Sequence, residues 1–232
     1  MKTKIPEDKK KQNSSHKRSD TNHPSYKKEL MFTIIFQRII EGKYPVNLRL
    51  KENELAAEFN LSRTPVREVL RQLEQYGLIE ILPRRGASII PFSSDDIEEI
   101  YELRKTLEVL ALRFAQPFLC LDRLNEIRLR IKELKSIKHS HNELSLDQGL
   151  HSYIVESCNK RRIQTILRPI LRLMRSFSYL GIDNPKREEK AANDHMNILT
   201  ALITGDYNKA RHCLEEHIER SKKDAISNLF QL

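Results

Sequence analysis

The sequence has little cysteine and no long apolar run. Its three cysteines, Cys120, Cys158 and Cys213, are far apart and form no CxxC pair, so we expect a reducing compartment and no disulfide framework. The most apolar short run, MFTIIF from Met31, is far shorter than the roughly 20 residues that a membrane span needs. No apolar run with a small-residue cleavage site follows the basic N-terminal segment. We therefore expect a cytoplasmic protein with no signal peptide and no membrane partner.

The chain does contain many charges and enough apolar residues for a core. Of its 232 residues, 39% are hydrophobic and 31% are charged, which is typical of one large globular domain or two smaller ones. The net charge is +9, and residues 1–28 alone hold nine Lys or Arg against three Asp or Glu, a balance of +6. We expect residues 1–25 to form a disordered basic tail. The tail either attracts DNA phosphates in a salt-sensitive way or is a solvated leader.

Residues 26–92 have the pattern of a winged helix-turn-helix. Apolar residues at helical spacing predict three helices, over 26–41, 51–59 and 62–76. Ser62 or Thr64 can cap the third helix. Two short apolar runs, from Leu78 and Ser88, flank the sequence PRRGA, which predicts a β-hairpin with a basic tip.

Residues 93–232 show only amphipathic helical patterns, which predict an all-α antiparallel bundle of about six helices. The expected spans are 95–118, 121–138, 143–157, 160–180, 187–204 and 206–230. Asp95 with Glu98 resembles a capping box at the start of the first helix. The chain is therefore expected to be mostly α, with a winged domain at 26–92 and a helical domain at 93–232.

The third helix of the winged domain directs arginines away from its apolar stripe. Arg63, Arg67 and Arg71 recur every four residues on the side opposite Val66 and Leu73. In a helix-turn-helix, residues at the start of this helix reach base edges and phosphates, and an outward arginine can bind guanine or a phosphate. The alternative is a solvated basic face.

The hairpin tip is a second candidate for contact with DNA. Arg84 and Arg85 lie at the tip, and Gly86 allows the hairpin to approach DNA closely. These residues predict a wing beside the minor groove or the DNA backbone, with a polar hairpin turn as the alternative.

Four polar residues of the helical domain are expected on apolar helix faces: Asp147, His151, His195 and His217. Asp147 and His151 are four residues apart and so stack on one helix face, together with Leu150. One carboxylate and three imidazoles suit a borderline divalent ion such as Zn²⁺, Ni²⁺ or Co²⁺. For any single histidine, a hydrogen-bonded core residue is the alternative.

Arg104 is expected on a helix that is too apolar to leave it exposed. A buried arginine needs an anion. The partner is either a protein carboxylate such as Glu108 or the carboxylate of a small ligand, bound through two parallel hydrogen bonds.

The run LKENELAAEFNLSRTPVREVLRQLEQYGLIEILPRRG, residues 50–86, resembles the DNA-binding domain of GntR-type bacterial transcription regulators, and SRTPVRE is its most specific stretch. The resemblance implies DNA contacts at Asn53, Ser62, Arg63, Thr64, Arg67 and Gly86. Val46-Asn47 replaces the family's usual Pro-Gly pair before the second helix. Because Asn tolerates a positive φ better than most residues, we expect the turn to survive.

The segment 95–229 resembles the FCD effector domain of the FadR-like branch of that family, and six helices rather than seven indicate its VanR-like subgroup. This resemblance implies a metal site formed by Asp147, His151, His195 and His217, with zinc or nickel the expected metals, and an effector contact at Arg104. It also implies a homodimer that binds a palindromic operator and responds to a small carboxylate metabolite, most often by release from DNA.

Two other functions fit the same residues. In a metal-sensing regulator the ion itself is the signal. In a metal-dependent hydrolase the ion would activate water, but the sequence offers neither an HExxH-like spacing nor a nucleophile with a base, so we expect no enzyme activity.

Overall fold

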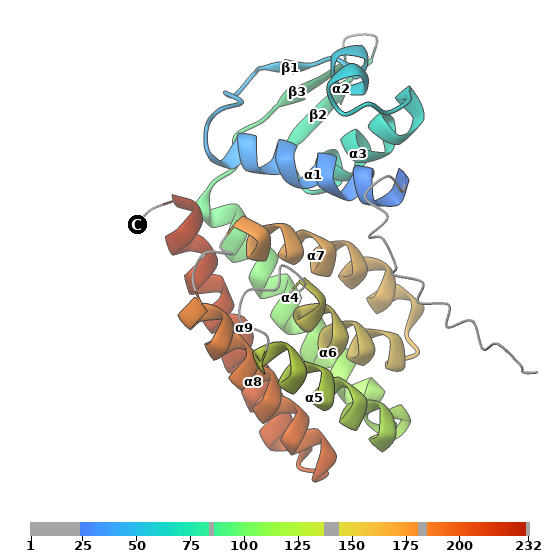
Figure 1. Ribbon diagram of the computed structural model, residues 1–232, viewed down its shortest axis with the longest axis vertical. Helices are drawn as coiled ribbons and strands as arrows, with labels where there is room; N and C mark the ends of the chain where they lie inside the picture. The colour runs from blue at the N-terminus through green and yellow to red at the C-terminus, as the bar shows by residue number, and fades with distance from the viewer. Residues whose placement is uncertain (1–23, 84–85, 137–143, 181–184, 231–232) are drawn as a thin grey trace, which may run out of the picture.

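The computed structural model describes residues 24–83, 86–136, 144–180 and 185–230. The expected tail, residues 1–25, lies almost entirely outside these ranges. In Figure 1 the N-terminal elements form one unit and helices α4 to α9 form a second unit beneath it. The chain is mostly helical, as predicted.

The N-terminal unit is a winged helix-turn-helix. Its helices are α1 (Pro24–Ile40), α2 (Glu52–Glu58) and α3 (Arg63–Gln75), and its strands are β1 (Arg49–Leu50), β2 (Ile79–Leu82) and β3 (Gly86–Ile89). The strands form an antiparallel sheet in the order β1-β3-β2. The hairpin was predicted, but β1 was not, because a strand of two residues is too short to show an alternating pattern.

The apolar stripe of α3 decides how this helix packs. Val66, Val69, Leu70 and Leu73 are buried, so α3 lies against α1 and the sheet with its polar side outward. Ser62 occupies the position before the helix, as one of the two predicted caps, but its side chain makes no capping hydrogen bond.

The turn at Val46-Asn47 confirms the expectation for this departure from the family pattern. Asn47 has a φ of 68°, in the left-handed region that asparagine tolerates better than most residues. Its backbone N–H donates to the carbonyl oxygen of Ile89 at 2.9 Å, which anchors the turn to the end of β3.

The second unit is the predicted helical bundle. Within the described residues its six α-helices are α4 (Ser94–Ala115), α5 (Leu121–Ser136), α6 (Leu144–Ser157), α7 (Arg161–Leu180), α8 (Pro185–Ile203) and α9 (Tyr207–Phe230). The first predicted helix is shorter than expected, because the chain tightens into a 3₁₀ turn, η1 (Gln116–Phe118), around Pro117. None of the helices in the described ranges combines the length and apolar character of a membrane span.

The capping box at the start of α4 lies at different residues from those predicted. Ser93 and Asp96 form it, rather than Asp95 and Glu98: the Ser93 backbone N–H donates to Asp96 Oδ2 at 2.7 Å. The helix begins one residue earlier than expected, because Ser93 is extended and can accept the role of the cap.

Helix α4 is central in the bundle and packs against α6, α7 and α9, while α8 lies along α9 (Figure 1). Only residues 90–93 separate β3 of the winged unit from α4. The helix that crosses the bundle core thus follows the wing after a short connection.

Candidate functional site

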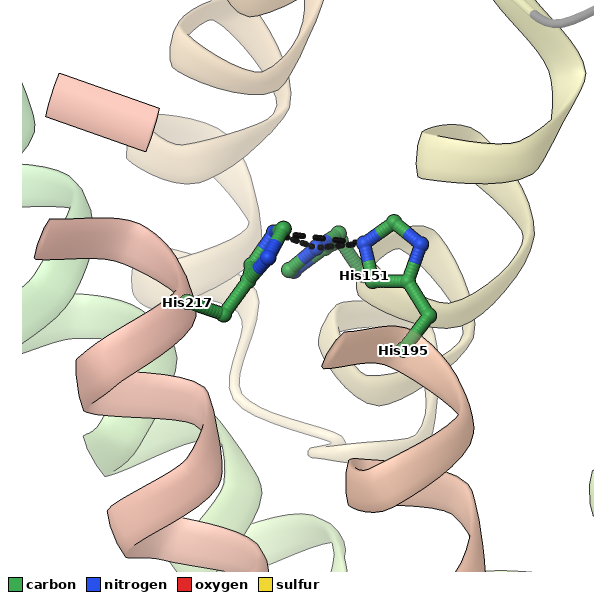
Figure 2. Close-up of side chains that lie close together, drawn as sticks. All are labelled: His151, His195 and His217. Atoms are coloured by element: carbon green, nitrogen blue, oxygen red, sulfur yellow. Dashed lines mark hydrogen bonds between the residues drawn. The ribbon is translucent and has the colours of Figure 1, made fainter. Parts of the chain in front are cut away.

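Three histidines from three helices meet in the core of the bundle. His151 comes from α6, His195 from α8 and His217 from α9, and each is at most 2% exposed. Every pair of their Nε2 atoms lies 3.2 Å apart, and Figure 2 shows the rings directed at one another. The structure thus brings together three of the four metal ligands predicted from the sequence.

Asp147, the fourth predicted ligand, lies on α6 one helical turn before His151. Its side chain is outside the described part of the structure. Its role as a ligand therefore stays a prediction.

Glu108 on α4 orients His151. The ring Nδ1 of His151 donates to Glu108 Oε2 at 2.5 Å, and Arg104 Nε donates to Glu108 Oε1 at 2.6 Å. Burial alone would raise the pKa of Glu108, but its contacts with His151 and Arg104 outweigh the burial and lower the pKa to about 2. Glu108 is therefore an ionised hydrogen-bond acceptor in the core.

Arg104 is buried, and its partner is Glu108. A protein carboxylate was one of the two partners that the sequence left open. The Nη2 of Arg104 also lies 3.3 Å from His151 Nε2. A guanidinium only donates hydrogen bonds, so this contact requires a lone pair on that nitrogen. This is consistent with a His151 tautomer that carries its proton on Nδ1, where it is donated to Glu108.

Asp194 stands in a similar position behind His217. Its Oδ2 lies 3.5 Å from His217 Nδ1, and Arg220 donates to both of its oxygens, at 2.9 and 2.8 Å. Burial would raise the pKa of Asp194, but the contacts with His217 and Arg220 hold it below its ordinary value. Asp194 is thus a second ionised carboxylate beside the outer nitrogen of a clustered imidazole.

The cluster has the chemistry of a site for a borderline divalent ion. In a tetrahedral zinc site with Zn–N distances of about 2.0–2.1 Å, ligand nitrogens lie about 3.3–3.4 Å apart, close to the 3.2 Å seen here. When a carboxylate holds the proton on Nδ1, the lone pair of Nε2 faces the centre. Lone pairs at such short range repel unless a proton or a cation lies between them, and imidazole nitrogens favour Zn²⁺ or Ni²⁺ over Ca²⁺.

Sequence reasoning missed Asp194 and Arg220 and treated Glu108 only as a partner for Arg104. A weak signal existed for each of them. Glu108 follows Arg104 by four residues, Asp194 precedes a buried histidine, and Arg220 follows His217 by three residues. Helical spacing cannot show that these carboxylates lie behind imidazoles of other helices.

The predicted DNA-contacting residues of the winged unit lie on its surface. Ser62, Arg63, Thr64 and Arg67 are exposed at the start of α3, and Asn53 is exposed on α2. Arg67 Nε donates to both carboxylate oxygens of Glu52, at 2.9 and 2.8 Å. The start of α3 therefore presents a basic, solvent-accessible edge of the kind that enters a major groove.

Gly86 has a structural reason to be glycine. Its φ is +81°, and a Cβ there would lie 3.0 Å from the carbonyl oxygen of Leu50. The backbone of β1 therefore already requires glycine at this position, whether or not DNA approaches it. Contact with DNA at this residue stays a prediction, and Arg84 and Arg85 lie outside the described residues.

A winged helix-turn-helix joined to a helical bundle with a buried ligand-type cluster defines a class: regulators that couple a DNA-binding domain to a sensing domain. Two family models match this division. Residues 31–89 match the bacterial regulatory proteins of the gntR family, and residues 99–220 match the FCD domain. The chain belongs to the GntR family of transcription regulators and carries an FCD domain.

Individual proteins agree with this assignment. The gluconate operon transcriptional repressor of Bacillus licheniformis is 31% identical over 177 residues, which cover 73% of this chain and 72% of that protein. The structure of E. coli McbR/YncC superposes with a TM-score of 0.63 at 21% identity, over 88% of this chain and 97% of that one. A metal-free FCD domain of another regulator gives a TM-score of 0.52 at 21% identity, over 61% of this chain and 99% of that one.

These families and relatives are transcription regulators, and the chain is accordingly a regulator rather than an enzyme. The likeness to the two solved structures supports the fold. The VanR-like subgroup stays a prediction.

Proposed function

We propose that the protein is a repressor that binds a palindromic operator as a homodimer and releases it when a small carboxylate metabolite binds at a divalent metal in the FCD domain. The observation that carries the proposal is the convergence of three buried Nε2 atoms within 3.2 Å of one another. The 31% identical relative is a gluconate operon repressor, which supports repression and a sugar acid as one effector class.

The metal is held by His151, His195 and His217, with Asp147 as the proposed fourth ligand. Zinc and nickel suit this donor set best. When bound, the ion would supply a Lewis-acidic centre that attracts a carboxylate oxygen of the effector. Arg104, whose Nη2 lies 3.3 Å from His151 Nε2, is the residue we assign to contact with the effector.

The DNA-binding half acts through the exposed edge of α3. In a homodimer the two recognition helices would reach half-sites about one helical turn apart. An effector shifts this arrangement only if it binds one arrangement of the domains better than the other. Helix α4 carries Arg104 and Glu108, and a short connection joins it to β3. The effector site is therefore linked covalently to the wing through a few residues.

Asp147→Ala tests the metal and effector part. We expect this variant to lose bound metal and effector response while it keeps its affinity for the operator, because the winged domain is untouched. The probe is a thermal-shift screen of metal-loaded protein with gluconate, other sugar acids, hydroxy acids and amino acids, since a ligand of the native state raises the melting temperature. A normal metal content in the variant, by elemental analysis, would remove Asp147 from the site.

Arg67→Ala tests the DNA part. If Arg67 contacts a base, loss of its side chain should weaken operator binding by about 1–3 kcal/mol. If it contacts a phosphate, the slope of the logarithm of the binding constant against the logarithm of the salt concentration should fall by about one. Fluorescence anisotropy at several salt concentrations distinguishes the two. Arg211→Ala is the matched control, because Arg211 is an exposed arginine paired with a glutamate on α9. Equal affinities for Arg67→Ala and wild type would refute the assignment.

A metal-sensing regulator is the second candidate, favoured by how closely the three imidazoles already converge. In that case operator affinity would follow the concentration of Zn²⁺ or Ni²⁺ with no organic acid present. If it does, the ion is the signal and the carboxylate effector is not needed.

A further inference from the structure

Two of the three clustered histidines have a similar set of residues behind the ring, with a contact of 2.5 Å to the carboxylate at His151 and of 3.5 Å at His217. An arginine holds a carboxylate, and the carboxylate faces the outer nitrogen Nδ1 of the imidazole. Arg104 and Glu108 do this for His151, and Arg220 and Asp194 do it for His217. The repetition on separate helices suggests a shared role, and the second set lies outside everything predicted from the sequence.

We propose that Asp194 is a positioning residue of the metal centre. It favours the tautomer of His217 that carries its proton on Nδ1, so that the lone pair of Nε2 faces the other two imidazoles. This inference rests on the proposed metal function. It adds that Asp194 and Arg220, which do not bind the ion themselves, help to set the affinity for it.

The geometry separates Asp194 from the ligands themselves. Its nearest ring atom in His217 is Nδ1, whereas the atoms that converge are the Nε2 atoms on the other side of each ring. Among the described residues, the group of side chains close enough to share an ion contains the three histidines and not Asp194. Asp194 therefore acts through His217 rather than on the ion.

Arg220 fixes the carboxylate in place. It follows His217 by three residues on α9, so the two side chains lie on one helix face, and it binds both oxygens of Asp194 from there. Asp194 in turn is the residue before His195 on α8. This one carboxylate ties together the two helices that supply two of the three imidazoles, and it sets the ring of His217 relative to His195.

The distance of 3.5 Å from Asp194 to His217 is long for a hydrogen bond. The contact nevertheless places an anion beside Nδ1, the ring nitrogen of His217 on that side. Carboxylates in such outer positions typically contribute 10–100-fold to metal affinity.

Asp194→Asn tests the proposal. It keeps the shape of the side chain and removes the charge, and we expect binding of Zn²⁺ and Co²⁺ to weaken by about tenfold or more. The measurement is competition against a chromogenic chelator with the full-length chain. The Co²⁺ absorption spectrum gives a second readout, because an altered ligand tautomer changes the coordination of the ion, which a purely structural role would not do.

Arg220→Gln provides a second variant that is less severe for folding, since the side chain of Arg220 is 34% exposed. We expect a smaller loss of metal affinity, and no further loss when it is combined with Asp194→Asn, because both act through the same contact. Glu216→Gln is the control: Glu216 lies 3.7 Å from Arg220 on the surface and should leave metal binding unchanged.

The outcomes separate the positioning role of Asp194 from the metal site itself. If wild type binds Zn²⁺ and Asp194→Asn binds it equally well, with an unchanged Co²⁺ spectrum, the positioning role is wrong and the metal site stands. If the wild type binds neither ion, the proposed metal function fails and the positioning role fails with it.

Discussion

At the scale of single residues, Gly86 shows that glycine can be required at a position for a reason other than the one expected from the sequence. The sequence suggested that it lets the wing approach DNA, whereas its positive φ and its contact with the backbone of Leu50 already require glycine. When both backbone conformation and DNA contact could require a glycine, its position in the sequence cannot show which of them does.

Gly86→Ala should destabilise the winged domain by about 1–3 kcal/mol, because a side chain is strained at this φ and meets the carbonyl of Leu50. Urea denaturation gives the free energy of unfolding. Gly149→Ala is the control, since its Cβ would meet a side-chain carbon of Ile127 at an ordinary 3.7 Å, and Ala is favoured over Gly within a helix. Equal stabilities of Gly86→Ala and wild type would show that the backbone relaxes at no cost.

The site residues were predictable to different degrees for physical reasons. His151, His195 and His217 could be found because each interrupts an apolar stripe, and a polar group on a buried face needs a partner. Asp194 lies beside the stripe of α8 and interacts with residues of α9. Its role depends on how α8 and α9 pack together, and the residue pattern of a single helix cannot predict that packing.

At the scale of elements, a hydrogen bond joins the residue that follows α3 to the bundle. The hydroxyl of Tyr76, directly after α3, donates to the carbonyl of Pro169 in α7 at 2.7 Å. The same ring makes an edge contact with Phe32 of α1, with centroids 5.5 Å apart. Tyr76 therefore joins three elements from both domains.

Tyr76→Phe keeps the ring contact and removes the hydroxyl, and we expect it to weaken the attachment of the winged domain by about 0.5–1.5 kcal/mol. Amide hydrogen exchange in α1 and α3 should become faster, and calorimetry should show a lower melting temperature for this domain. Tyr26→Phe serves as the control, because Tyr26 is 48% exposed. Unchanged exchange in Tyr76→Phe would mean that the hydroxyl contributes nothing to domain attachment.

Elements were predictable where the pattern was long enough. The helices of the bundle were expected from their amphipathic period, and their ends differ from the prediction by a few residues. Strand β1 and the change to a 3₁₀ turn at η1 were missed, because each covers two or three residues. Their conformation is decided by the pairing with β3 and by Pro117 rather than by a repeated pattern.

At the scale of the whole molecule, a short covalent connection, the packing of α1 against α7 and a polar contact join the two units. Four residues separate β3 from helix α4, which carries Glu108 to the histidine cluster. A change in the packing of α4 around the cluster thus has a short route to the wing, and the Tyr76 contact gives α7 a route to the recognition helix.

The central claim is that His151, His195 and His217 together hold one divalent ion, and metal content measured by elemental analysis tests it most directly. Wild type purified in the presence of Zn²⁺ and freed of excess ion should contain about one ion per chain, and His195→Ala should contain far less, because loss of a direct ligand leaves two converging nitrogens. His212→Ala, on the exposed side of α9, should match wild type. Wild type without metal, or His195→Ala with a full complement, would contradict the account.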